Sequence, residues 1–559
     1  MTNNDIKMAK GFSRPSQQII IAVRGFTDTN LTQWVEIEYN GKSALVEYRI
    51  FAVDRGGVWA SLSHKGVVIV PKAVKANLVE QVENLEDFPP RLIFSKPGWC
   101  QGQFANSSGK VFAPNSAQKG AIAFIPDRIK CSRKGTHVKW MKDVAELLKH
   151  HPIPSFFLMI PFAAVMLELS NRTDNFGFEL AGEGGKGKST TQRLMASSVG
   201  PAMENGRGYI TTFLMTAAAF EQSMRWHSDM PFIIDEANLF GSGEGGRADK
   251  NKMRNFCFQM ASGTTKGRFD NPQQEGYRFI FVTSANEPFN ELLGETHHNI
   301  ADAATDRLMS ITVPEGDAGV FGALPSGFDS YRQFTLALET AMSQQFGTAM
   351  PKFLRKLLAQ RQTNEEQLKD IIRRKIDQFK TEVAVNDNNG SDVRVAEAFG
   401  LVYAAGDFAR HHGILPRDFD CLGAALHCYA NFRSTVPIRQ SLRERLIAIV
   451  NRPETLTIDR RNLPDFSDEK VAGAGAFIRE CKGKTLLLMT PTFGQKMFPD
   501  WDALKGSAEF VALNLSNEKG RGRGYHCRIR TNKRSDWFYC FILPPELVEQ
   551  LPQALLPTR

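Results

Sequence analysis

The sequence lacks the features of a secreted, zinc-binding or membrane-spanning protein. Its 8 cysteines are scattered, and none forms a C-x-x-C pair, so neither a zinc site nor a disulfide framework is predicted. The N-terminal residues contain no apolar signal core. The most apolar run, Phe156–Leu169, is too short for a membrane span and contains Pro161. We therefore expect a cytoplasmic protein with reduced thiols and no membrane partner, in which this run is a buried helix.

Internal repeats and long low-complexity segments are also missing. The chain is 42% hydrophobic and 23% charged, which is typical of a globular protein. Its net charge of +9 fits a polyanionic partner, but it also fits an ordinary soluble basic protein. A length of 559 residues suggests several domains, with more than one buried core.

The first part of the chain has the pattern of a mostly β domain, which we place at residues 1–135. β-Branched and aromatic residues alternate with polar ones, and Asn-Gly and Gly-Gly interrupt them. This pattern predicts strands within residues 17–26, 33–51, 58–70 and 91–99. One helix is predicted near residues 73–85.

The pattern then changes three times along the chain. Strand and helix patterns alternate in residues 136–330, which is typical of a parallel α/β layer. Residues 331–435 are helical in pattern, with a break of turn residues at Val383–Asp392. Residues 436–559 combine one strong helix with short strands.

A glycine-rich run fits the phosphate-loop pattern G-x-x-x-x-G-K-[ST]. It reads GEGGKGKS, between the apolar strand pattern FGFELAG and the proline-free helix pattern STTQRLMASSV. Glycines let backbone N–H groups surround phosphates, and the helix N-terminus adds a favourable dipole. Lys188 would reach the β- and γ-phosphates, and Ser189 would hold Mg²⁺. The residues expected to bind ATP are Gly182, Gly184, Gly185, Gly187, Lys188, Ser189 and Thr190. Lys186 would either add a phosphate contact or stay solvated.

Two carboxylates follow the next apolar run, which reads DMPFIIDEANLF. A strand that ends in Asp235 and Glu236 is the Walker B arrangement: Asp235 would support Mg²⁺, and Glu236 would polarise the attacking water. A catalytic glutamate beside the magnesium aspartate favours water as the nucleophile. The pair therefore predicts hydrolysis rather than small-molecule kinase chemistry. The structural alternative is an Asp-Glu pair that only caps a helix after a core strand.

Two further polar residues indicate a ring-forming motor. The apolar run Phe279–Val282 leads to Asn286, a candidate for the residue that orients water against the γ-phosphate, called sensor 1 in AAA+ ATPases; Ser284 competes for this role. Arg307 precedes the strand pattern LMSITVP. In ring ATPases an arginine at this place faces the γ-phosphate of the neighbouring subunit. The alternatives are an asparagine in a turn and an arginine in an ion pair.

Basic residues in two predicted hairpins are candidates for DNA contacts. Lys266 and Arg268 lie in a hairpin ahead of the sensor 1 strand, where they would face a central pore or would only brace the hairpin. Arg521 and Arg523 lie in the run NEKGRGRGYHCRIRTNKR, which has the pattern of the wing of a winged helix. They would lie on a DNA backbone or form a solvated charged face.

Together these segments resemble the minichromosome-maintenance-like AAA+ helicase family of plasmids and other mobile genetic elements, many members of which are known only as a domain of unknown function. The resemblance covers most of the chain. It implies an N-terminal DNA-associated domain, an AAA+ P-loop core, a helical lid and a C-terminal winged-helix-like domain. It also implies hexameric rings that unwind DNA with ATP. The segments that carry it are KPGWCQG, the phosphate loop, IIDEANLF, ASGTTKGR, TSANEP, TDRLMSITVPEGDAGVFG and VRVAEAFGLVYAAGDFARHHG.

The chain departs from the family pattern in three places. The phosphate loop has Gly-Gly-Lys-Gly before Lys188, and the sensor 1 segment ends in Ser-Ala-Asn-Glu. Ala398 stands where a basic residue often precedes Phe-Gly-Leu. The candidates for the lid arginine, called sensor 2, are therefore Arg394 and Arg410.

The sequence as a whole predicts an ATP-dependent, ring-forming DNA helicase or translocase for the replication of a mobile element or phage. The expected partners are a single DNA strand in a central pore, the fork duplex and further copies of the chain. A primase or polymerase of the same element is a candidate partner. The first alternative is an AAA+ remodeller, initiator, loader or anti-phage ATPase that binds DNA without unwinding it. The second is a non-catalytic DNA-binding scaffold with a structural nucleotide.

Overall fold

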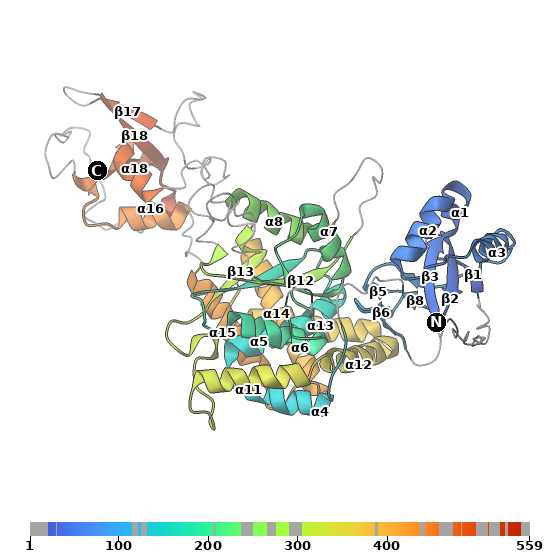
Figure 1. Ribbon diagram of the computed structural model, residues 1–559. Coiled ribbons are helices and arrows are strands. Elements are labelled where there is room, and N and C mark those ends of the chain that lie inside the picture. The colour runs from blue at the N-terminus through green and yellow to red at the C-terminus, as the bar shows by residue number, and fades with distance from the viewer. Residues whose placement is uncertain are drawn as a thin grey trace, which may run out of the picture. The chain divides into compact units, whose positions relative to one another are not determined.

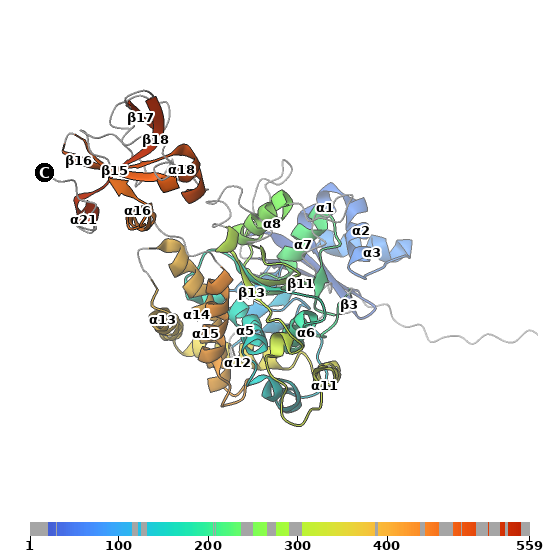
Figure 2. The same ribbon diagram turned by 90° about the vertical axis from the view of Figure 1, so that its left-hand side faces the viewer.

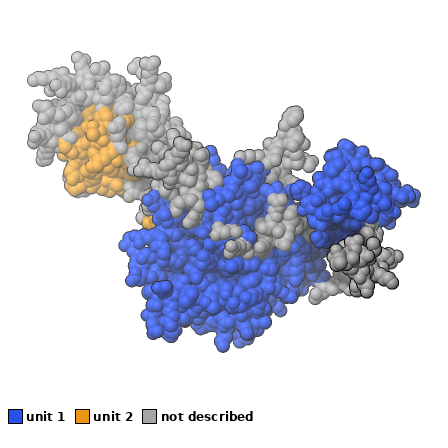
Figure 3. Space-filling model, in the orientation of Figure 1, with its two compact units in different colours: residues 1–289, 306–432 blue, residues 290–305, 433–559 orange. Residues whose placement is uncertain are grey.

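The chain divides into two compact units (Figure 3). Unit 1 comprises residues 1–289 and 306–432, and unit 2 comprises residues 290–305 and 433–559. The start of the main part of unit 2 lies close to the domain boundary predicted at residue 436, and the other predicted boundaries fall inside unit 1. The computed structural model describes residues 21–28, 31–114, 121–123, 131–204, 206, 208–235, 250–264, 276–289, 304–385, 389–435, 442–457, 473–481, 483–498, 513, 526–530 and 535–548.

The N-terminal part of unit 1 contains an antiparallel sheet and more helix than the sequence predicted (Figure 1). The predicted helix near residues 73–85 is confirmed as α3. The predicted strands at 48–51 and 58–70 are wrong, because 48–51 and 58–64 are helical and 65–70 contains no strand. Asp54 caps the second of these helices by accepting a hydrogen bond from the Gly57 N–H at 2.9 Å. The elements are β1 (Ile21–Thr27), β2 (Gln33–Tyr39), β3 (Lys42–Glu47), α1 (Tyr48–Val53), α2 (Arg55–His64) and α3 (Lys72–Glu83).

Short strands follow, and they are tied to the rest of unit 1 through Trp99. The Trp99 backbone N–H donates to Asp229 Oδ2 at 2.9 Å, and its indole N–H donates to the Val165 carbonyl at 2.9 Å. β5, β6 and β7 form one sheet, while β4 pairs with β8. Their bounds are β4 (Ile93–Phe94), β5 (Gly98–Cys100), β6 (Gln103–Ala105), β7 (Val111–Phe112) and β8 (Ile122–Ala123).

The centre of unit 1 is a parallel five-stranded sheet with the order β10-β11-β12-β9-β13. The predicted parallel α/β layer is thus confirmed. The carboxyl ends of parallel strands meet at one edge of a sheet, so the segments that follow β9, β11 and β12 emerge together. The strands are β9 (Phe176–Ala181), β10 (Thr211–Thr212), β11 (Met230–Asp235), β12 (Phe279–Ala285) and β13 (Leu308–Thr312).

Helices cover both faces of this sheet. On one face, the Phe178 ring lies 5.0 Å from Phe156 of α5 and 5.1 Å from Phe399 of α14, centroid to centroid. On the other face, Phe256 of α8 packs against Phe281 of β12 and against Phe220 of α7. The helices that flank the strands are α4 (His137–Trp140), α5 (Pro152–Met166), α6 (Lys188–Val199), α7 (Ala217–Trp226) and α8 (Lys250–Ser262).

The apolar helix α5 is part of the core. The stretch Pro152–Ser170 is long and apolar enough to cross a membrane by length and composition alone, yet 89% of its apolar window is buried inside the protein. Figure 2 shows α5 between α14 and α6. The prediction of a buried helix containing Pro161 is confirmed.

The predicted helical region is confirmed as well. It forms a set of helices that ends unit 1, with the expected break between α13 and α14. Within the set, α14 packs against both α13 and α5. The helices are α11 (Tyr331–Gln344), α12 (Ala349–Thr363), α13 (Glu365–Glu382), α14 (Gly390–His411) and α15 (Cys421–Thr435).

Unit 2 contains a five-stranded sheet with the order β14-β15-β16-β18-β17. Leu446 and Ile449 of the predicted strong helix, α16, belong to the same buried cluster as Ile478 and Phe541 of this sheet. The elements are α16 (Leu442–Val450), β14 (Leu456–Thr457), β15 (Ala476–Cys481), β16 (Lys484–Met489), α18 (Pro491–Met497), β17 (His526–Arg530), β18 (Ser535–Ile542) and α21 (Pro545–Val548).

Candidate nucleotide-binding site

The glycine-rich loop connects the end of β9 to the start of α6, as the sequence predicts. Gly182, Gly185 and Gly187 have φ angles of +151°, +76° and +88°, which residues with side chains rarely adopt. A Cβ atom on Gly187 would also lie 2.6 Å from Val320 Cγ2. No side chain in the described part of the chain caps α6. Its first N–H groups can therefore serve an anion at the loop.

The unusual Gly-Gly-Lys part of the loop has a structural role. The Lys186 carbonyl accepts a hydrogen bond from the Val320 N–H at 3.0 Å, which fastens the loop to the short helix η5 (Gly319–Phe321). Gly319 has a φ of +49°, and a Cβ atom there would clash with this carbonyl. The Lys186 ammonium lies 3.9 Å from a Glu183 carboxylate oxygen, so the Lys186 side chain pairs only weakly within the loop.

Lys188 lies inside the loop. Its ammonium donates to the carbonyls of Gly182 and Glu183, the second at 2.9 Å, and lies 3.4 Å from Asn286 Oδ1. Burial lowers the pKa of Lys188, against the charges of Asp235 and Glu179, which raise it. Phosphate oxygens would be stronger acceptors for this ammonium than the neutral carbonyls are.

Ser284 and Asn286, the two candidates for the water-orienting role, make different contacts. The Ser284 hydroxyl donates to Asp235 Oδ1 at 3.1 Å and so holds this carboxylate in place. Asn286 is exposed and approaches Lys188. The arrangement assigns Ser284 to the orientation of Asp235 and leaves the Asn286 amide facing the space above the loop.

These residues surround a cavity of about 750 Å³, a size typical of small-molecule sites. The cavity collects most of the predicted phosphate-binding residues together with Asp235 and Asn286. Its other side is formed by α11, a predicted helix whose contribution to the site the sequence analysis missed. The lining residues include Gly184, Gly185, Gly187, Lys188, Ser189, Thr190, Arg193, Asp235, Ser284, Asn286, Phe321, Tyr331, Arg332, Leu336 and Glu339.

The α11 side of the cavity supplies apolar surface and a carboxylate that pairs with Arg193 of α6. Tyr331 and Leu336 line it, and Leu336 is 64% exposed, which suits contact with a flat base. Arg193 of α6 pairs with Glu339 of α11 at 2.8 Å and with Glu204 at 2.9 Å. No motif marks these α11 residues, because the fold alone brings them to the loop.

The predicted lid arginines lie elsewhere. Arg394 lies 3.6 Å from the Asp306 carboxylate, and Arg410 pairs with Asp407. Neither residue lines the cavity, whereas Arg193 and Arg332 do.

Arg307 lies at the amino ends of the parallel strands, whereas the loop lies at their carboxyl ends. Its carbonyl accepts a hydrogen bond from the Gly177 N–H at 2.7 Å, and its guanidinium lies 5.3 Å from the Phe258 ring centroid. About 16 Å of extended strand separates Gly177 from Gly182, at about 3.3 Å per residue. Arg307 is therefore placed away from the cavity of its own chain.

Several predicted site residues lie outside the described residues. They are Glu236, Lys266, Arg268, Arg521 and Arg523. Their assigned roles remain predictions.

A buried carboxylate that the sequence analysis did not select lies under the loop. Glu179 Oε2 accepts hydrogen bonds from the Ser310 hydroxyl at 2.6 Å and from the Phe289 N–H at 2.8 Å. Burial raises the pKa of Glu179 to about 7, opposed by these two hydrogen bonds and by Lys188. Glu179 thus connects β13 to the segment that follows Asn286. The available signal was an acidic residue within the apolar strand pattern FGFELAG.

The chain is similar to known proteins in two ways: part of its sequence matches a protein family, and its fold is similar to that of a solved protein. Residues 16–271, a little under half of the chain, match the family described as "Domain of unknown function (DUF927)". A solved protein named "SCCmec type IV Cch - active helicase" has a similar fold, with a TM-score of 0.62 and 15% sequence identity. The similarity covers 95% of this chain and 94% of that chain. No curated protein sequence matches the chain.

The raised pKa of Glu179 predicts a pH-dependent difference between the protein and a Glu179→Gln variant. Between pH 4.5 and about 7 the unfolded chain releases this proton while the folded chain retains it, so the native protein loses stability as the pH rises through this window. The loss amounts to roughly 3 kcal/mol, and glutamine avoids it. Urea unfolding at pH 5 and pH 8 should show the variant gaining stability relative to the native protein at the higher pH.

Glu183→Gln is the matched control, because the Glu183 side chain is 81% exposed and belongs to the same segment. Its unfolding should follow the native pH dependence. A Glu179→Gln variant with that same pH dependence would contradict the account.

Proposed function

We propose that this protein is an ATP-dependent, ring-forming AAA+ DNA helicase or translocase that serves the replication of a mobile element or phage. The observation that carries the proposal is the meeting of Lys188, Asp235 and Asn286 around one cavity at the carboxyl edge of a parallel sheet. The fold similarity to a protein named as an active helicase supports the helicase part. We place the protein in the cytoplasm.

The residues of the cavity fit a magnesium nucleotide. Backbone N–H groups of the loop and of the α6 N-terminus would hold the phosphates, and Lys188 would neutralise the β- and γ-phosphates. Mg²⁺ in such sites takes one or two protein oxygens together with phosphates and water. Ser189 and Asp235 supply such oxygens, and Ser284 keeps the Asp235 carboxylate oriented. When bound, the metal would neutralise the charge that develops on the phosphates.

Hydrolysis requires groups that orient water and stabilise the transition state. Glu236, directly after Asp235, would accept the proton of the attacking water, and the Asn286 amide would orient that water. Arg307 lies at the far edge of the sheet and would serve the cavity of a neighbouring subunit. This geometry is the reason for proposing a ring, which we take to be a hexamer.

DNA would contact parts of the chain outside the cavity. Lys266 and Arg268 would follow a single strand through the pore, and ATP hydrolysis would move them. Arg521 and Arg523 would lie on the DNA backbone as the wing of a winged-helix-like domain in unit 2. A primase or polymerase of the same element would act at the fork.

The two lysines of the loop allow a matched test of nucleotide binding. Lys188→Ala should reduce ATP turnover by at least about 100-fold, because it removes the positive charge that stabilises the transferred phosphoryl group. Lys186→Ala should retain turnover within about 10-fold, because the Lys186 backbone holds the loop and its side chain pairs only weakly. Steady-state phosphate release measures both. Equal losses in the two variants would contradict the assignment.

A strand-displacement assay on a forked DNA substrate tests the helicase activity itself. The native protein should separate the strands with ATP, and Glu236→Gln should bind ATP without separating them, because it lacks the carboxylate that polarises water. ATP hydrolysis stimulated by single-stranded DNA with no strand separation would favour a loader or remodeller. Unchanged turnover in Glu236→Gln would favour the scaffold alternative.

A further inference from the structure

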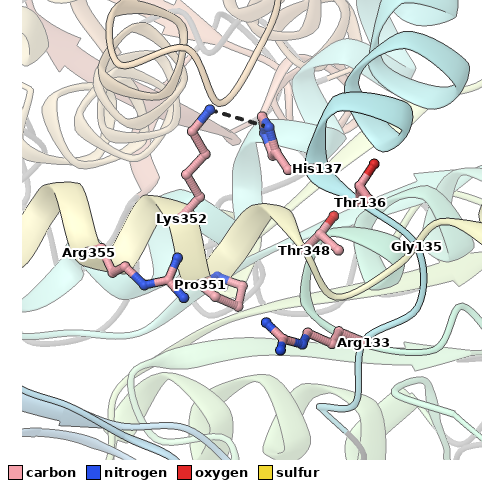
Figure 4. Close-up of a pocket in the computed structure, with 8 residues that line it drawn as sticks. All are labelled: Arg133, Gly135, Thr136, His137, Thr348, Pro351, Lys352 and Arg355. Carbon is pink, nitrogen blue, oxygen red and sulfur yellow. Dashed lines mark hydrogen bonds between the residues drawn. The ribbon is translucent and has the colours of Figure 1, made fainter.

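Unit 1 contains another cavity, outside the candidate nucleotide-binding site, with a volume of about 230 Å³. It lies where the segment before α4 meets the start of α12. Among the residues that the structure describes, its charged lining is entirely basic: Arg133, Lys352 and Arg355 face it together with His137, and no described carboxylate belongs to it. In Figure 4 the Arg133 and Arg355 guanidinium groups point toward each other from opposite sides of Pro351.

The backbone around this cavity is firmly held. Lys134 and Phe346 exchange two backbone hydrogen bonds, each 3.0 Å long. The Thr136 N–H donates to the Gln345 side-chain oxygen at 3.1 Å. Gly135 has a φ of +77°, and a Cβ atom there would clash with this Gln345 side chain. Arg133 directly precedes Lys134 in the chain, so these contacts fix the backbone next to Arg133.

Two of the cations have no partner within the part of the chain that the structure describes. Arg133 and Arg355 make no ion pair and no hydrogen bond there. Lys352 does have partners: its ammonium donates to the Gly413 carbonyl at 2.7 Å and to His137 Nδ1 at 3.3 Å. His137 Nε2 lies 3.1 Å from the Ile414 carbonyl. A neutral ring that donates from Nε2 and accepts at Nδ1 satisfies both contacts.

The positive charges destabilise one another. Burial and then Lys352 lower the pKa of His137, and burial and then Lys356 lower the pKa of Lys352. Burial lowers the pKa of Lys110, with further effects from Arg133 and Arg355. An anion bound among these groups would relieve this repulsion. Two further cations lie near those of the cavity: Lys110 is close enough to be affected by Arg133 and Arg355, and Lys356 is close enough to affect Lys352.

The start of α12 adds a helix N-terminus to the site. Thr348, the N-cap residue, lines the cavity, but its hydroxyl oxygen is shielded from solvent and so does not face the cavity. The N-terminus of α12, a helix of 15 residues, opens beside it with no side-chain cap. Helix N-termini carry a partial positive charge that favours anions.

We propose that this cavity binds a backbone phosphate of a single nucleic-acid strand. Its volume is below the range of about 300–1,000 Å³ that accommodates whole small ligands, so it suits one group of a larger molecule. Two guanidinium groups that face each other match the oxygens of a phosphate. The further cations, Lys110 and Lys356, would meet the neighbouring phosphates. The inference rests on the proposed DNA binding but concerns a site separate from the pore hairpin and the wing.

A binding assay with a labelled dT20 oligonucleotide, in the absence of ATP, tests the inference. Fluorescence anisotropy measures the binding over a series of NaCl concentrations. Arg133→Gln and Arg355→Gln should each weaken binding by about 10-fold. Each should also reduce the slope of log K against log [NaCl] by about 0.7, the value for one lost contact to a single strand. Arg133→Lys should restore most of the slope. Arg374→Gln, an exposed position on α13, is the matched control and should bind as the native protein does.

The outcomes separate this site from the proposed function. If the native protein binds dT20 and both variants bind it with native affinity and slope, the inference is overturned and the proposed function stands. If pyrophosphate stabilises the native protein more than it stabilises the variants, while dT20 binding stays unchanged, the cavity holds a small anion and the inference is again overturned. If the native protein does not bind dT20 at all, the inference is overturned, and the strand-displacement assay with ATP decides the proposed function separately. ATP-induced thermal stabilisation equal to that of the native protein shows that the variants are folded.

Discussion

The parallel pairing of β9 with β12 is the constraint on which the candidate nucleotide-binding site depends. This pairing aligns Ala181 with Ala285. The Gly182 N–H extends the pairing by one residue, because it donates a hydrogen bond to the Ala285 carbonyl at 3.1 Å. The loop after one strand and Asn286 after the other therefore emerge side by side. A slip of one residue would turn every side chain of β9 to the other face. Glu179 would then lose its two hydrogen bonds.

The two ends of the parallel strands hold different residues of the proposed active site. The carboxyl ends hold the loop and Asp235. The amino ends hold Arg307 and an ionic network in which Asp306 accepts a hydrogen bond from the Ser391 hydroxyl at 2.6 Å. Between the ends, Glu179 bonds to Ser310, which lies in the strand that Arg307 precedes. Glu179 therefore joins the middle of β13 to the segment that follows β12.

Much of the site could be predicted because its signals are local. The phosphate loop, the Asp235 strand and the Asn286 strand are contiguous motifs with apolar runs before them, and the parallel layer follows from their alternation with helices. The helix α2 was missed because its cap at Asp54 and its buried pair, Val58 and Leu62, were outweighed by the β-branched composition around them.

The rest of the site could not be predicted from local patterns. Tyr331 and Leu336 reach the loop only through the packing of α11 against α6. The basic cavity joins Arg133 to Arg355 across more than two hundred residues of sequence. Neither grouping has a fixed spacing, so only tertiary structure reveals it.

The central claim is that the cavity of one subunit is completed by Arg307 of the next. Electron microscopy of the protein with single-stranded DNA and a slowly hydrolysed ATP analogue tests it most directly. The account predicts a closed ring around the strand, with each Arg307 guanidinium within hydrogen-bond distance of the neighbouring γ-phosphate. Nucleotide bound to separate single chains, or a ring in which Arg307 faces away from the neighbouring cavity, would contradict it.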